Sequence, residues 1–372
     1  MMVSDQQLYY MQCALDLACQ GVGRTAPNPA VGAVIVKDGE IVGRGFHPRA
    51  GEPHAEVFAL RDAGARARDA DVYVTLEPCS HFGKTPPCAE ALVAAGVKRV
   101  FVGVTDPNPR VAGAGVARLE QAGIEVRVGV QEEQCRRLIA PFKKHILSGL
   151  PFTIYKTAMT LDGATATWSG DSQWVSSAAS RRHVHHLRDR VEAIMVGIET
   201  VLHDDPLLNT RLDDGAGRDP LRVVVDSRLR MPPSSRMLKQ SSAAATLIAT
   251  GAEDAAKIRR LEEAGAEVLV LPLNGAKVSL PALWRELGRR QVQRLLLEGG
   301  ATLATAALKE RLIDQLMLFA APKILGGLPT RGIFAGPGCD KMATAEVLTD
   351  IRFEQIENDL LITGDLNPCL PD

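Results

Sequence analysis

Hydrophobic residues in the first 130 positions alternate between helical spacing and short apolar runs typical of strands. Between Gln6 and Cys19 the apolar residues recur every three or four positions, and Gly21 ends the predicted helix. Lys37-Asp38-Gly39-Glu40 reads as a hairpin turn between two strands. The pattern predicts helices at 6–19, 55–63, 88–95 and 114–122, and strands at 33–36, 41–43, 72–76, 99–104 and 125–128. Strands alternating with helices predict an α/β sandwich.

A second α/β unit begins after Ser148-Gly149-Leu150-Pro151, which divides the chain into predicted domains 1–148 and 149–372. A strand is predicted at 153–158, and a long polar loop follows it. Further strands are predicted at 193–197, 222–226, 246–250, 268–271, 294–297, 316–320 and 360–364, and helices at 178–189, 255–264, 281–290 and after Gly300. The two units have no internal repeat in common.

Composition narrows the class of protein. A length of 372 residues predicts two or three domains, and 46% hydrophobic with 23% charged residues is ordinary for a globular protein. A formal net charge of −1 argues against a protein that wraps nucleic acid or coats an anionic membrane. No apolar run approaches the ~18 residues of a membrane helix, and no secretory signal is visible. Seven cysteines, an odd number, do not suggest a disulfide scaffold. These features predict a cytoplasmic enzyme of two domains.

Three potential zinc ligands stand at element boundaries in the first domain. His54 begins a predicted helix, Cys79 follows a strand, and Cys88 comes after two prolines and so lies in a first helical turn. One imidazole and two thiolates form the three-ligand shell of a catalytic zinc, which leaves a fourth position for water. Zinc can lower the pKa of bound water to about 7. Glu56 lies two residues from His54 and could carry protons.

The arrangement H-x-E followed by P-C-x-x-C is the signature of zinc deaminases. Here the second cysteine comes after eight intervening residues instead of two. One alternative is that these residues are ordinary core or surface positions, and another is a closed structural zinc site with His81 as fourth ligand. The remaining cysteines have no comparable spacing and are interpreted as packing or surface thiols: Cys13, Cys19, Cys135, Cys339 and Cys369.

The stretches PNPAVGAVIV, GEPHAEVFAL, TLEPCSHFGKTPPC and TDPNPRVAGAG resemble the deaminase half of the bifunctional riboflavin-biosynthesis deaminase/reductases. This resemblance implies a cytidine-deaminase-like α/β/α sandwich in which His54, Cys79 and Cys88 bind Zn²⁺ and Glu56 transfers protons. It implies deamination by zinc hydroxide of 2,5-diamino-6-ribosylamino-4(3H)-pyrimidinone 5′-phosphate. It also suggests that Asn28 and His47 contact the substrate, and Lys84 suits its phosphate or a pyrimidine oxygen. A turn asparagine, a surface histidine and a solvated lysine are the alternative interpretations.

The second domain has no G-x-G-x-x-G after a strand. It has Glu298-Gly299-Gly300-Ala301 between a predicted strand and a helix, where backbone amides form an anion site and glycine permits close approach of a pyrophosphate. Glycine also ends strands for other reasons, so this signal is weak by itself.

The stretches TLDG, SGDSQWVSS, TVLHDDPLLNTR, VVVDSR and APKILGG resemble the reductase half of the same family, which has a dihydrofolate-reductase-like α/β fold. The resemblance implies that NADPH delivers hydride to the sugar C1′ and converts a ribosyl into a ribityl chain. The implied cofactor contacts are Ala158, Trp174, Thr200, Asp204, Ser227, Gly300, Ala301, Thr302, Leu303, Ala304, Thr305 and Ala306. The implied substrate contacts are Ser172, Arg188, Leu208, Arg211 and Glu298.

Several of these residues have other interpretations. Arg188 could be a solvated helix residue, although it and Arg211 could each bind a sugar phosphate bidentately. Trp174 could be a core aromatic, and Asp204 could belong to a turn. Asp226 ends a strand, where it could bind a ribose 2′-hydroxyl and favour NAD. Ser227 and Arg228 could instead bind a 2′-phosphate, and the resemblance favours NADPH.

Taken together, the sequence predicts a bifunctional enzyme acting on a small ribosylaminopyrimidine phosphate, with neither nucleic acid nor membrane as partner. Family precedent implies a homo-oligomer formed through the reductase domain. The alternative is a nucleic-acid or nucleobase editing deaminase with a non-catalytic second domain. That alternative would call for a basic domain with stacking aromatics, yet aromatic residues make up 4% of the chain. A non-catalytic binding protein would be expected to lack Glu56 or a zinc ligand, and all are present.

Overall fold

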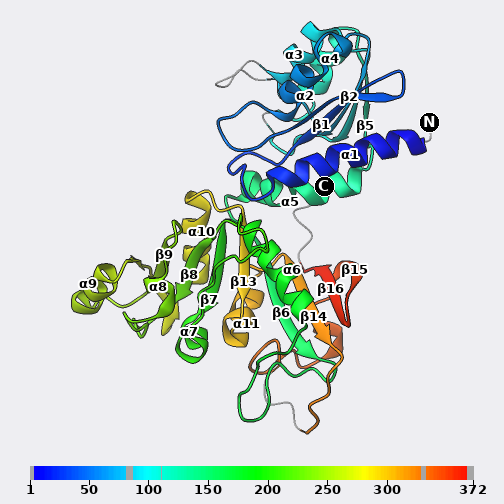
Figure 1. The fold of residues 1–372 in the computed structure, drawn as a ribbon. Coiled ribbons are helices and arrows are strands. Elements are labelled where there is room, and N and C mark those ends of the chain that lie inside the picture. Colours follow the sequence, from blue (N-terminus) through cyan, green and yellow to red (C-terminus); the bar gives the residue numbers. More distant parts are fainter. Residues whose placement is uncertain (1–3, 81–86, 110, 328–331, 367–372) are drawn as a thin grey trace. The chain divides into compact units, whose positions relative to one another are not determined.

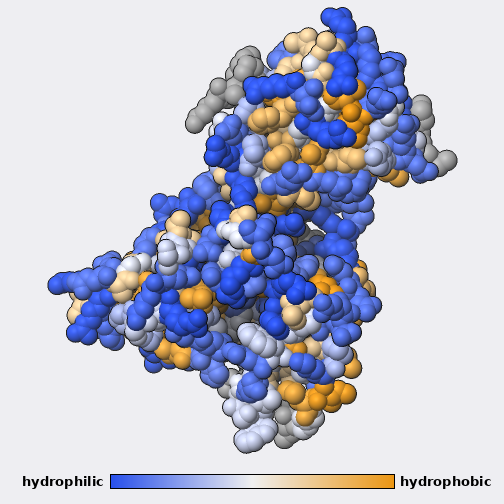
Figure 2. All heavy atoms as spheres, in the orientation of Figure 1, coloured by the Kyte–Doolittle hydropathy of each residue, from blue (hydrophilic) through white to orange (hydrophobic). Residues whose placement is uncertain are grey.

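The protein is described by a computed structural model, which defines residues 4–80, 87–109, 111–327 and 332–366. The chain divides into two compact units, Met1–Gly149 and Leu150–Asp372 (Figure 1). Figure 2 shows that hydrophilic and hydrophobic residues are mixed over the visible face of each unit. No helix in the described ranges is both long and apolar enough to cross a lipid bilayer.

Unit 1 contains a five-stranded sheet in the order β2-β1-β3-β4-β5. The strands are β1 (Gly32–Lys37), β2 (Glu40–Phe46), β3 (Asp71–Leu76), β4 (Arg99–Val104) and β5 (Glu125–Val128). Strand β1 pairs antiparallel with β2 and β3, whereas β3, β4 and β5 run parallel. The C-terminal ends of β3 and β4 therefore lie beside each other at one edge of the sheet. The segment that carries Cys79 begins there.

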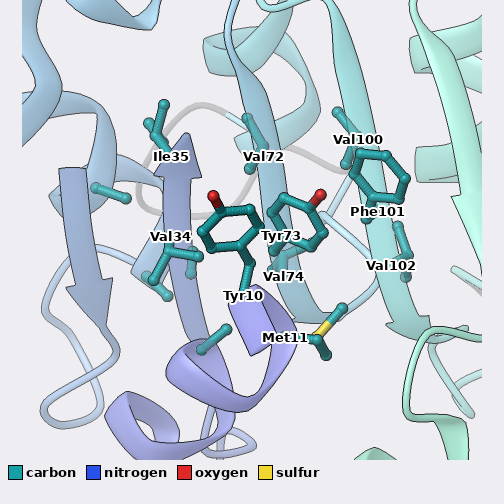
Figure 3. Packing of buried hydrophobic residues seen from close by; sticks show 14 of the residues in the cluster. Tyr10, Met11, Val34, Ile35, Val72, Tyr73, Val74, Val100, Phe101 and Val102 are labelled. Atoms are coloured by element: carbon teal, nitrogen blue, oxygen red, sulfur yellow. The ribbon is translucent and has the colours of Figure 1, made fainter. Parts of the chain in front are cut away.

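Helices cover both faces of this sheet, as the sandwich prediction requires. They are α1 (Asp5–Gly21), α2 (Ala55–Ala63), η1 (Gly64–Ala67), α3 (Cys88–Ala95), α4 (Ala114–Gln121) and α5 (Glu132–Ser148). Helices α1 and α5 contact each other on one side, and α2, α3 and α4 form a contacting series on the other (Figure 1). In the core between α1 and the sheet, the rings of Tyr73 and Phe101 stack with centroids 4.5 Å apart, and Tyr10 lies beside them (Figure 3).

Unit 2 is built on a nine-stranded sheet in the order β10-β9-β8-β7-β13-β6-β14-β16-β15. The strands are β6 (Phe152–Thr160), β7 (Ala193–Gly197), β8 (Leu221–Val225), β9 (Thr246–Thr250), β10 (Ala266–Val270), β13 (Arg294–Glu298), β14 (Gln315–Ala321), β15 (Thr349–Ile356) and β16 (Asp359–Asp365). The first seven strands in this order run parallel, and the hairpin β15–β16 joins β14 antiparallel. A small hairpin, β11 (Leu273–Asn274) with β12 (Lys277–Val278), lies outside the large sheet.

The helices of unit 2 pack on opposite faces of the large sheet. They are α6 (Ala178–Asp189), α7 (Ile198–Asp204), α8 (Arg236–Lys239), α9 (Ala255–Glu263), α10 (Leu280–Arg289), α11 (Ala301–Lys309) and the short turn η2 (Met342–Thr344). Trp284 of α10 and Ala304 of α11 belong to the main core, whereas Val184 of α6 packs with Phe319 and Leu361 in a separate cluster. The dihydrofolate-reductase-like α/β prediction agrees with this parallel sheet covered by helices.

Most predicted elements are present within one or two residues, and several that the sequence analysis did not predict are added. Helix α2 and strand β4 have the predicted bounds. Helices α5 and α7, strand β15 and the hairpin β11–β12 were not predicted. Helix α5 matters most for function, because Phe142 and Ile146 line the cavity described next.

Candidate active sites

Three side chains from different elements of unit 1 converge on one point. His54 is the residue before α2, Cys88 is the first residue of α3, and Cys79 follows β3. His54 Nδ1 lies 3.6 Å from Cys79 Sγ and 3.3 Å from Cys88 Sγ. Hydrogen bonding with Cys88 lowers the pKa of the Cys79 thiol and favours its thiolate, whereas the same contact and burial raise the pKa of the Cys88 thiol. A bound cation would favour the thiolate form of both. Ligands at ordinary zinc distances in a tetrahedron would be about 3.6 Å apart, so this donor set fits a zinc ion.

Glu56 lies in the first turn of α2, with 3% of its surface exposed. Burial, together with the negative charge of Cys79, raises the pKa of Glu56 to about 7. Its Oε2 has no hydrogen-bond partner within the described part of the chain. A buried carboxyl group with an unused oxygen and a pKa near neutrality can both accept and donate a proton.

A cavity of about 620 Å³ opens in front of these residues. Its wall includes the predicted substrate contacts Asn28 and His47. His47 Nδ1 lies 3.0 Å from the carbonyl oxygen of Pro53, so this nitrogen carries the proton, and Nε2 accepts a hydrogen bond from Asn28 Nδ2 at 3.1 Å. His47 is buried, which excludes the surface-histidine interpretation and lowers its pKa. Lys84 lies outside the described residues.

Three cavity residues were missed by the sequence analysis. Glu77 precedes Pro78-Cys79, and Asp106 and Asn108 follow β4, all on the cavity wall. Asp106 and Asn108 belong to the stretch TDPNPRVAGAG, which was noted only as a family motif. Their position directly after a buried strand is the signal that could have identified them, because the ends of adjacent parallel strands meet at one sheet edge.

In unit 2, a second cavity of about 540 Å³ lies at the ends of β7, β8 and β13. Six predicted cofactor contacts line it: Thr200, Ser227, Gly300, Thr302, Leu303 and Ala306. The other six are not among its lining residues: Ala158, Trp174, Asp204, Ala301, Ala304 and Thr305. Trp174 is 59% exposed, with the Arg181 guanidinium 4.5 Å from its ring centroid, so the core-aromatic interpretation is wrong.

Two consecutive glycines shape the start of α11 at this cavity. Gly299 and Gly300 have φ values of 68° and 77°, a region that side-chain-bearing residues rarely adopt. A Cβ at Gly299 would lie 3.3 Å from Thr200 Oγ1. The glycines thus bring backbone close to α7, and the first turn of α11 begins at the cavity wall, where the sequence predicts an anion site.

Asp226 does not bind a ribose, which settles one of the open alternatives. Its side chain is fully buried and accepts hydrogen bonds from the backbone N–H groups of Arg230 at 2.5 Å, Met231 at 2.8 Å and Arg228 at 3.4 Å. The carboxylate therefore holds the turn after β8. Ser227 and Arg228, which this turn presents, line the cavity together with Lys277 of β12.

Arg188 and Glu298, 110 positions apart, form a bidentate ion pair. Arg188 Nε and Nη2 each donate to a Glu298 carboxylate oxygen at 2.9 Å, and the two side chains are 14% and 12% exposed. Arg188 Nη1 also donates to the carbonyl of Asn209 at 3.1 Å. The solvated-helix interpretation of Arg188 is therefore wrong. Because its fork is occupied by Glu298, bidentate binding of a sugar phosphate by Arg188 does not fit this arrangement.

Other predicted substrate contacts lie around this pair. Arg211 Nη1 donates to Asn209 Oδ1 at 2.7 Å, and buried Leu208 precedes Asn209 in the chain. Ser172 lies in the loop between β6 and α6, and within the described part of the chain it makes no hydrogen bond with Arg188 or Glu298.

Lys156 was missed by the sequence analysis. It lies on β6, beside Glu298 in the register of β13. Burial lowers the pKa of Lys156, and the negative charge of Glu298 opposes this shift. Burial alone would raise the pKa of Glu298, but the charges of Arg188 and Lys156 lower it to about 2. A buried carboxylate is thus held between two cations at the end of the central strands.

Comparisons with known proteins identify the family. The cytidine and deoxycytidylate deaminase zinc-binding region matches residues 4–104, and the RibD C-terminal domain matches residues 151–362. The riboflavin biosynthesis protein RibD of Synechocystis sp. is 44% identical over 364 residues, covering 98% of this chain and 96% of that protein. The chain belongs to the RibD family.

Other RibD proteins give the same result. RibD of Escherichia coli is 44% identical, covering 95% of this chain and 96% of that protein. The structure of Acinetobacter baumannii RibD superposes with a TM-score of 0.84 at 40% identity, covering 98% of this chain and 99% of that one. A Thermotoga maritima structure, described as a diaminohydroxyphosphoribosylaminopyrimidine deaminase/5-amino-6-(5-phosphoribosylamino)uracil reductase, gives 0.85 at 34% identity, covering 97% and 99%.

Membership in the RibD family confirms the predicted class of enzyme. The chain is a bifunctional deaminase and reductase of riboflavin biosynthesis, and its cofactors are Zn²⁺ and NADPH. It acts on small-molecule substrates of that pathway. The editing-deaminase alternative is not favoured.

Proposed function

We propose that residues 1–148 deaminate 2,5-diamino-6-ribosylamino-4(3H)-pyrimidinone 5′-phosphate and that residues 149–372 reduce the ribosyl group of the product. The observation that carries the first assignment is the convergence of His54, Cys79 and Cys88 beside Glu56, whose Oε2 has no hydrogen-bond partner among the described residues. His54, Cys79 and Glu56 also line one cavity. The Thermotoga maritima relative is described with the same two activities. The match of a deaminase zinc-binding region to residues 4–104 and of the RibD C-terminal domain to residues 151–362 supports the assignment of one step to each unit.

In the deaminase unit, His54, Cys79 and Cys88 would hold zinc, which makes water nucleophilic at neutral pH when bound. Glu56 accepts one proton from the attacking water and gives it to the ring nitrogen. It then accepts the second proton from the new hydroxyl group and gives it to the amino group, so ammonia leaves as the carbonyl forms. His47 and Asn28 form a hydrogen-bonded pair on the cavity wall, where they orient the pyrimidine. Lys84 is proposed as a contact for the phosphate or a ring oxygen.

In the reductase unit, the cofactor cavity would hold NADPH. The amides at the start of α11 receive the pyrophosphate, and Ser227, Arg228 and Lys277 receive the 2′-phosphate. The other predicted cofactor contacts, among them Ala158 and Trp174, are proposed to contact the nicotinamide end of NADPH.

The reduction itself requires the ribosylamine to open to an imine. When bound, NADPH would supply the hydride for C1′ of this imine, and the imine nitrogen would take a proton, which would give the ribityl chain. Lys156, Arg188 and Glu298 place charged groups beside this substrate, and Arg211, Leu208 and Ser172 are proposed as further contacts. Arg211 is exposed and is the better candidate for the phosphate, because Arg188 is paired with Glu298.

A coupled assay tests both assignments. Zinc-replete protein is given the diaminopyrimidinone ribosyl phosphate and NADPH, and ammonia and NADPH absorbance are followed together. Ammonia release followed by one equivalent of NADPH oxidation is expected. Glu56→Gln should abolish both signals on this substrate but keep NADPH oxidation on the deaminated compound. Ammonia without NADPH oxidation would refute the reductase assignment, and absence of both signals would refute both assignments.

We also propose a homo-oligomer formed through the reductase unit. Strand β15 is at the edge of the nine-stranded sheet and exposes Ile351 and Phe353, the latter 67% exposed. An exposed apolar edge strand is a surface that proteins usually cover. Light scattering should give a multiple of the 39.9 kDa chain mass, and Phe353→Glu should reduce it. A wild-type monomer would refute the proposal.

A cytoplasmic location is proposed on the state of the cysteines. Cys13, Cys19, Cys79, Cys88, Cys135 and Cys339 are all free. Thiolate ligands and free thiols suit a reducing compartment. Cell fractionation should recover the deaminase activity with cytoplasmic markers, and recovery in an oxidising compartment would contradict the proposal.

A further inference from the structure

Glu77 is a buried charged residue for which the deamination chemistry above has no role. It stands between the end of β3 and the ligand Cys79, with 3% of its surface exposed. It also lies on the wall of the deaminase cavity. A buried carboxylate is costly to keep unless its oxygens are satisfied, so its partners show what it does.

Among the described residues, the hydrogen-bond partners of the Glu77 carboxylate are backbone N–H groups of the segment after β4. Oε2 accepts hydrogen bonds from the N–H groups of Asp106 and Gly113, both at 3.0 Å. Oε1 accepts from those of Gly115 at 2.8 Å and Val116 at 3.1 Å. One side chain thus fixes the beginning and the end of the 106–116 segment, of which residues 106–109 and 111–116 are described.

This segment supplies a wall of the deaminase cavity. Asp106, Asn108 and Val111 line it, and none of them is a zinc ligand or the proton-transfer group. The segment also packs tightly against Pro78, the residue before Cys79, because a Cβ at Gly115 would lie 1.9 Å from the carbonyl oxygen of Pro78. The position of Asp106 and Asn108 relative to Cys79 therefore depends on contacts that centre on Glu77.

We propose that Glu77 is a positioning residue for deamination, which holds the 106–116 segment so that its side chains meet the bound pyrimidine. The proposal rests on the proposed deaminase function of unit 1. Glu77 acts through the segment and not on the substrate, since both of its oxygens already accept two N–H groups each.

The chemistry of the four donors explains why a carboxylate is needed. An ionised carboxylate has about four acceptor sites and no proton, so it can serve four N–H groups. A glutamine of the same length has one amide nitrogen that cannot accept and that would face two N–H donors. An aspartate keeps the acceptors but is shorter by one methylene.

The test is Glu77→Gln in the full-length, zinc-loaded protein, assayed for ammonia release. Because the segment lines the binding cavity and carries no proton-transfer group, the loss should fall mainly on KM. We expect KM for the deaminase substrate to rise about tenfold or more, with kcat within about threefold of wild type. Zinc content should remain at the wild-type level, and Glu77→Asp should recover part of the loss.

Asp71→Asn is the matched control. Asp71 is the first residue of β3, the strand that Glu77 follows. Its carboxylate accepts hydrogen bonds from Arg99 Nε at 2.7 Å and Nη2 at 2.5 Å and has no such contact with the described residues of the 106–116 segment. This variant should lower the melting temperature of unit 1 without raising KM. NADPH oxidation on the deaminated substrate, measured in the same preparations, reports whether unit 2 is intact.

The possible results distinguish a failure of the positioning role of Glu77 from a failure of the deaminase assignment. Wild-type protein that releases no ammonia would refute the deaminase assignment. If wild type is active, an unchanged KM in Glu77→Gln would overturn the positioning role, and so would a KM increase of the same size in Asp71→Asn. Loss of zinc in Glu77→Gln would overturn it as well, because the effect would then act through the ligands.

Discussion

The two cavities differ in which atoms of their residues form the site, side-chain atoms in unit 1 and mainly backbone atoms in unit 2. The deaminase site depends on side-chain donor atoms, those of His54, Cys79 and Glu56 on the cavity wall and of Cys88 beside them. The cofactor cavity depends on backbone and on small residues at strand ends, such as Gly197 and Gly300, with cations at its rim. A site made of side chains requires particular residue types, which can be recognised in the sequence by their spacing. A site made of backbone requires mainly glycines, which also occur in proteins for many other reasons.

This contrast predicts that single substitutions act more severely in unit 1. Cys88→Ala removes one of the three proposed zinc ligands and should reduce ammonia release by about 10³-fold or more, since the activated water would be lost. Zinc content measured by mass spectrometry should fall, while NADPH oxidation on the deaminated substrate persists.

Cys135→Ala is the control for that variant, because Cys135 is also a buried free cysteine of unit 1 but lies in α5 away from the ligands. It should retain zinc and activity. Deaminase activity in zinc-free Cys88→Ala protein would contradict the metal site. Chelation of wild-type protein should reproduce the Cys88→Ala pattern, with restoration on adding Zn²⁺.

The buried ion pair of unit 2 predicts a loss of stability in acid. The pKa of Glu298 is lowered to about 2 in the folded protein, from an ordinary 4.5, so the unfolded state binds the proton more readily. The stabilisation is fully present above pH 4.5 and is lost as the pH falls from 4.5 towards 2. Its full size is about 3 kcal/mol. Thermal unfolding of unit 2 at several pH values measures it.

Glu298→Gln tests the origin of that pH dependence. The variant should be less stable at neutral pH, because Arg188 is left buried without its partner. Its stability should also change less between pH 4.5 and 2 than that of wild type. Parallel curves for the two proteins would assign the acid effect to other groups.

A third prediction concerns backbone shape at the cofactor cavity. Gly299→Val places a branched side chain at a φ of 68° and close to Thr200, so the start of α11 must shift. KM for NADPH should rise about 10- to 100-fold with unchanged ammonia release. Gly215→Val is the control, because Gly215 has a similar φ of 70° with open space around it. Equal effects of both variants would mean that general strain is responsible.

The smallest expected effect is on the choice of cofactor. Arg228→Ala or Lys277→Ala removes one cation from the cavity wall, and each should raise KM for NADPH about tenfold and leave KM for NADH nearly unchanged. Arg259→Ala, in α9 and not among the cavity residues, should change neither. Equal losses with NADPH and NADH would place the 2′-phosphate elsewhere.

How far the sequence predicts the molecule depends on whether the signal is local. Helix α3 is predicted with its correct bounds because Pro87 precedes it and Gly96 ends it. Helix α5 was missed, since Pro141 lies within it. Its acidic first turn and the ion pairs Glu132–Arg136 and Glu133–Arg137 were the available signal.

The sites show the same limit. The three proposed zinc ligands come from separate segments but keep a recognisable motif, and the structure brings them together as the sequence predicts. The pairing of Arg188 with Glu298 joins positions 110 residues apart and depends on the order of strands in the sheet. Nothing in the local sequence of Arg188 distinguishes this buried partner from a solvated helix residue. For the same reason, the role of Glu77 became visible only with its four backbone partners in place.

The burial of Asp226 has a consequence for redesigning this protein as a biocatalyst. In many nucleotide-binding enzymes, an acidic residue at a strand end is the natural position to edit when changing coenzyme preference. Here that edit would remove the acceptor for three backbone N–H groups and loosen the turn after β8. A library for NADH use should therefore leave Asp226 fixed and vary Arg228 and Lys277, whose exposed side chains can change without disturbing the scaffold.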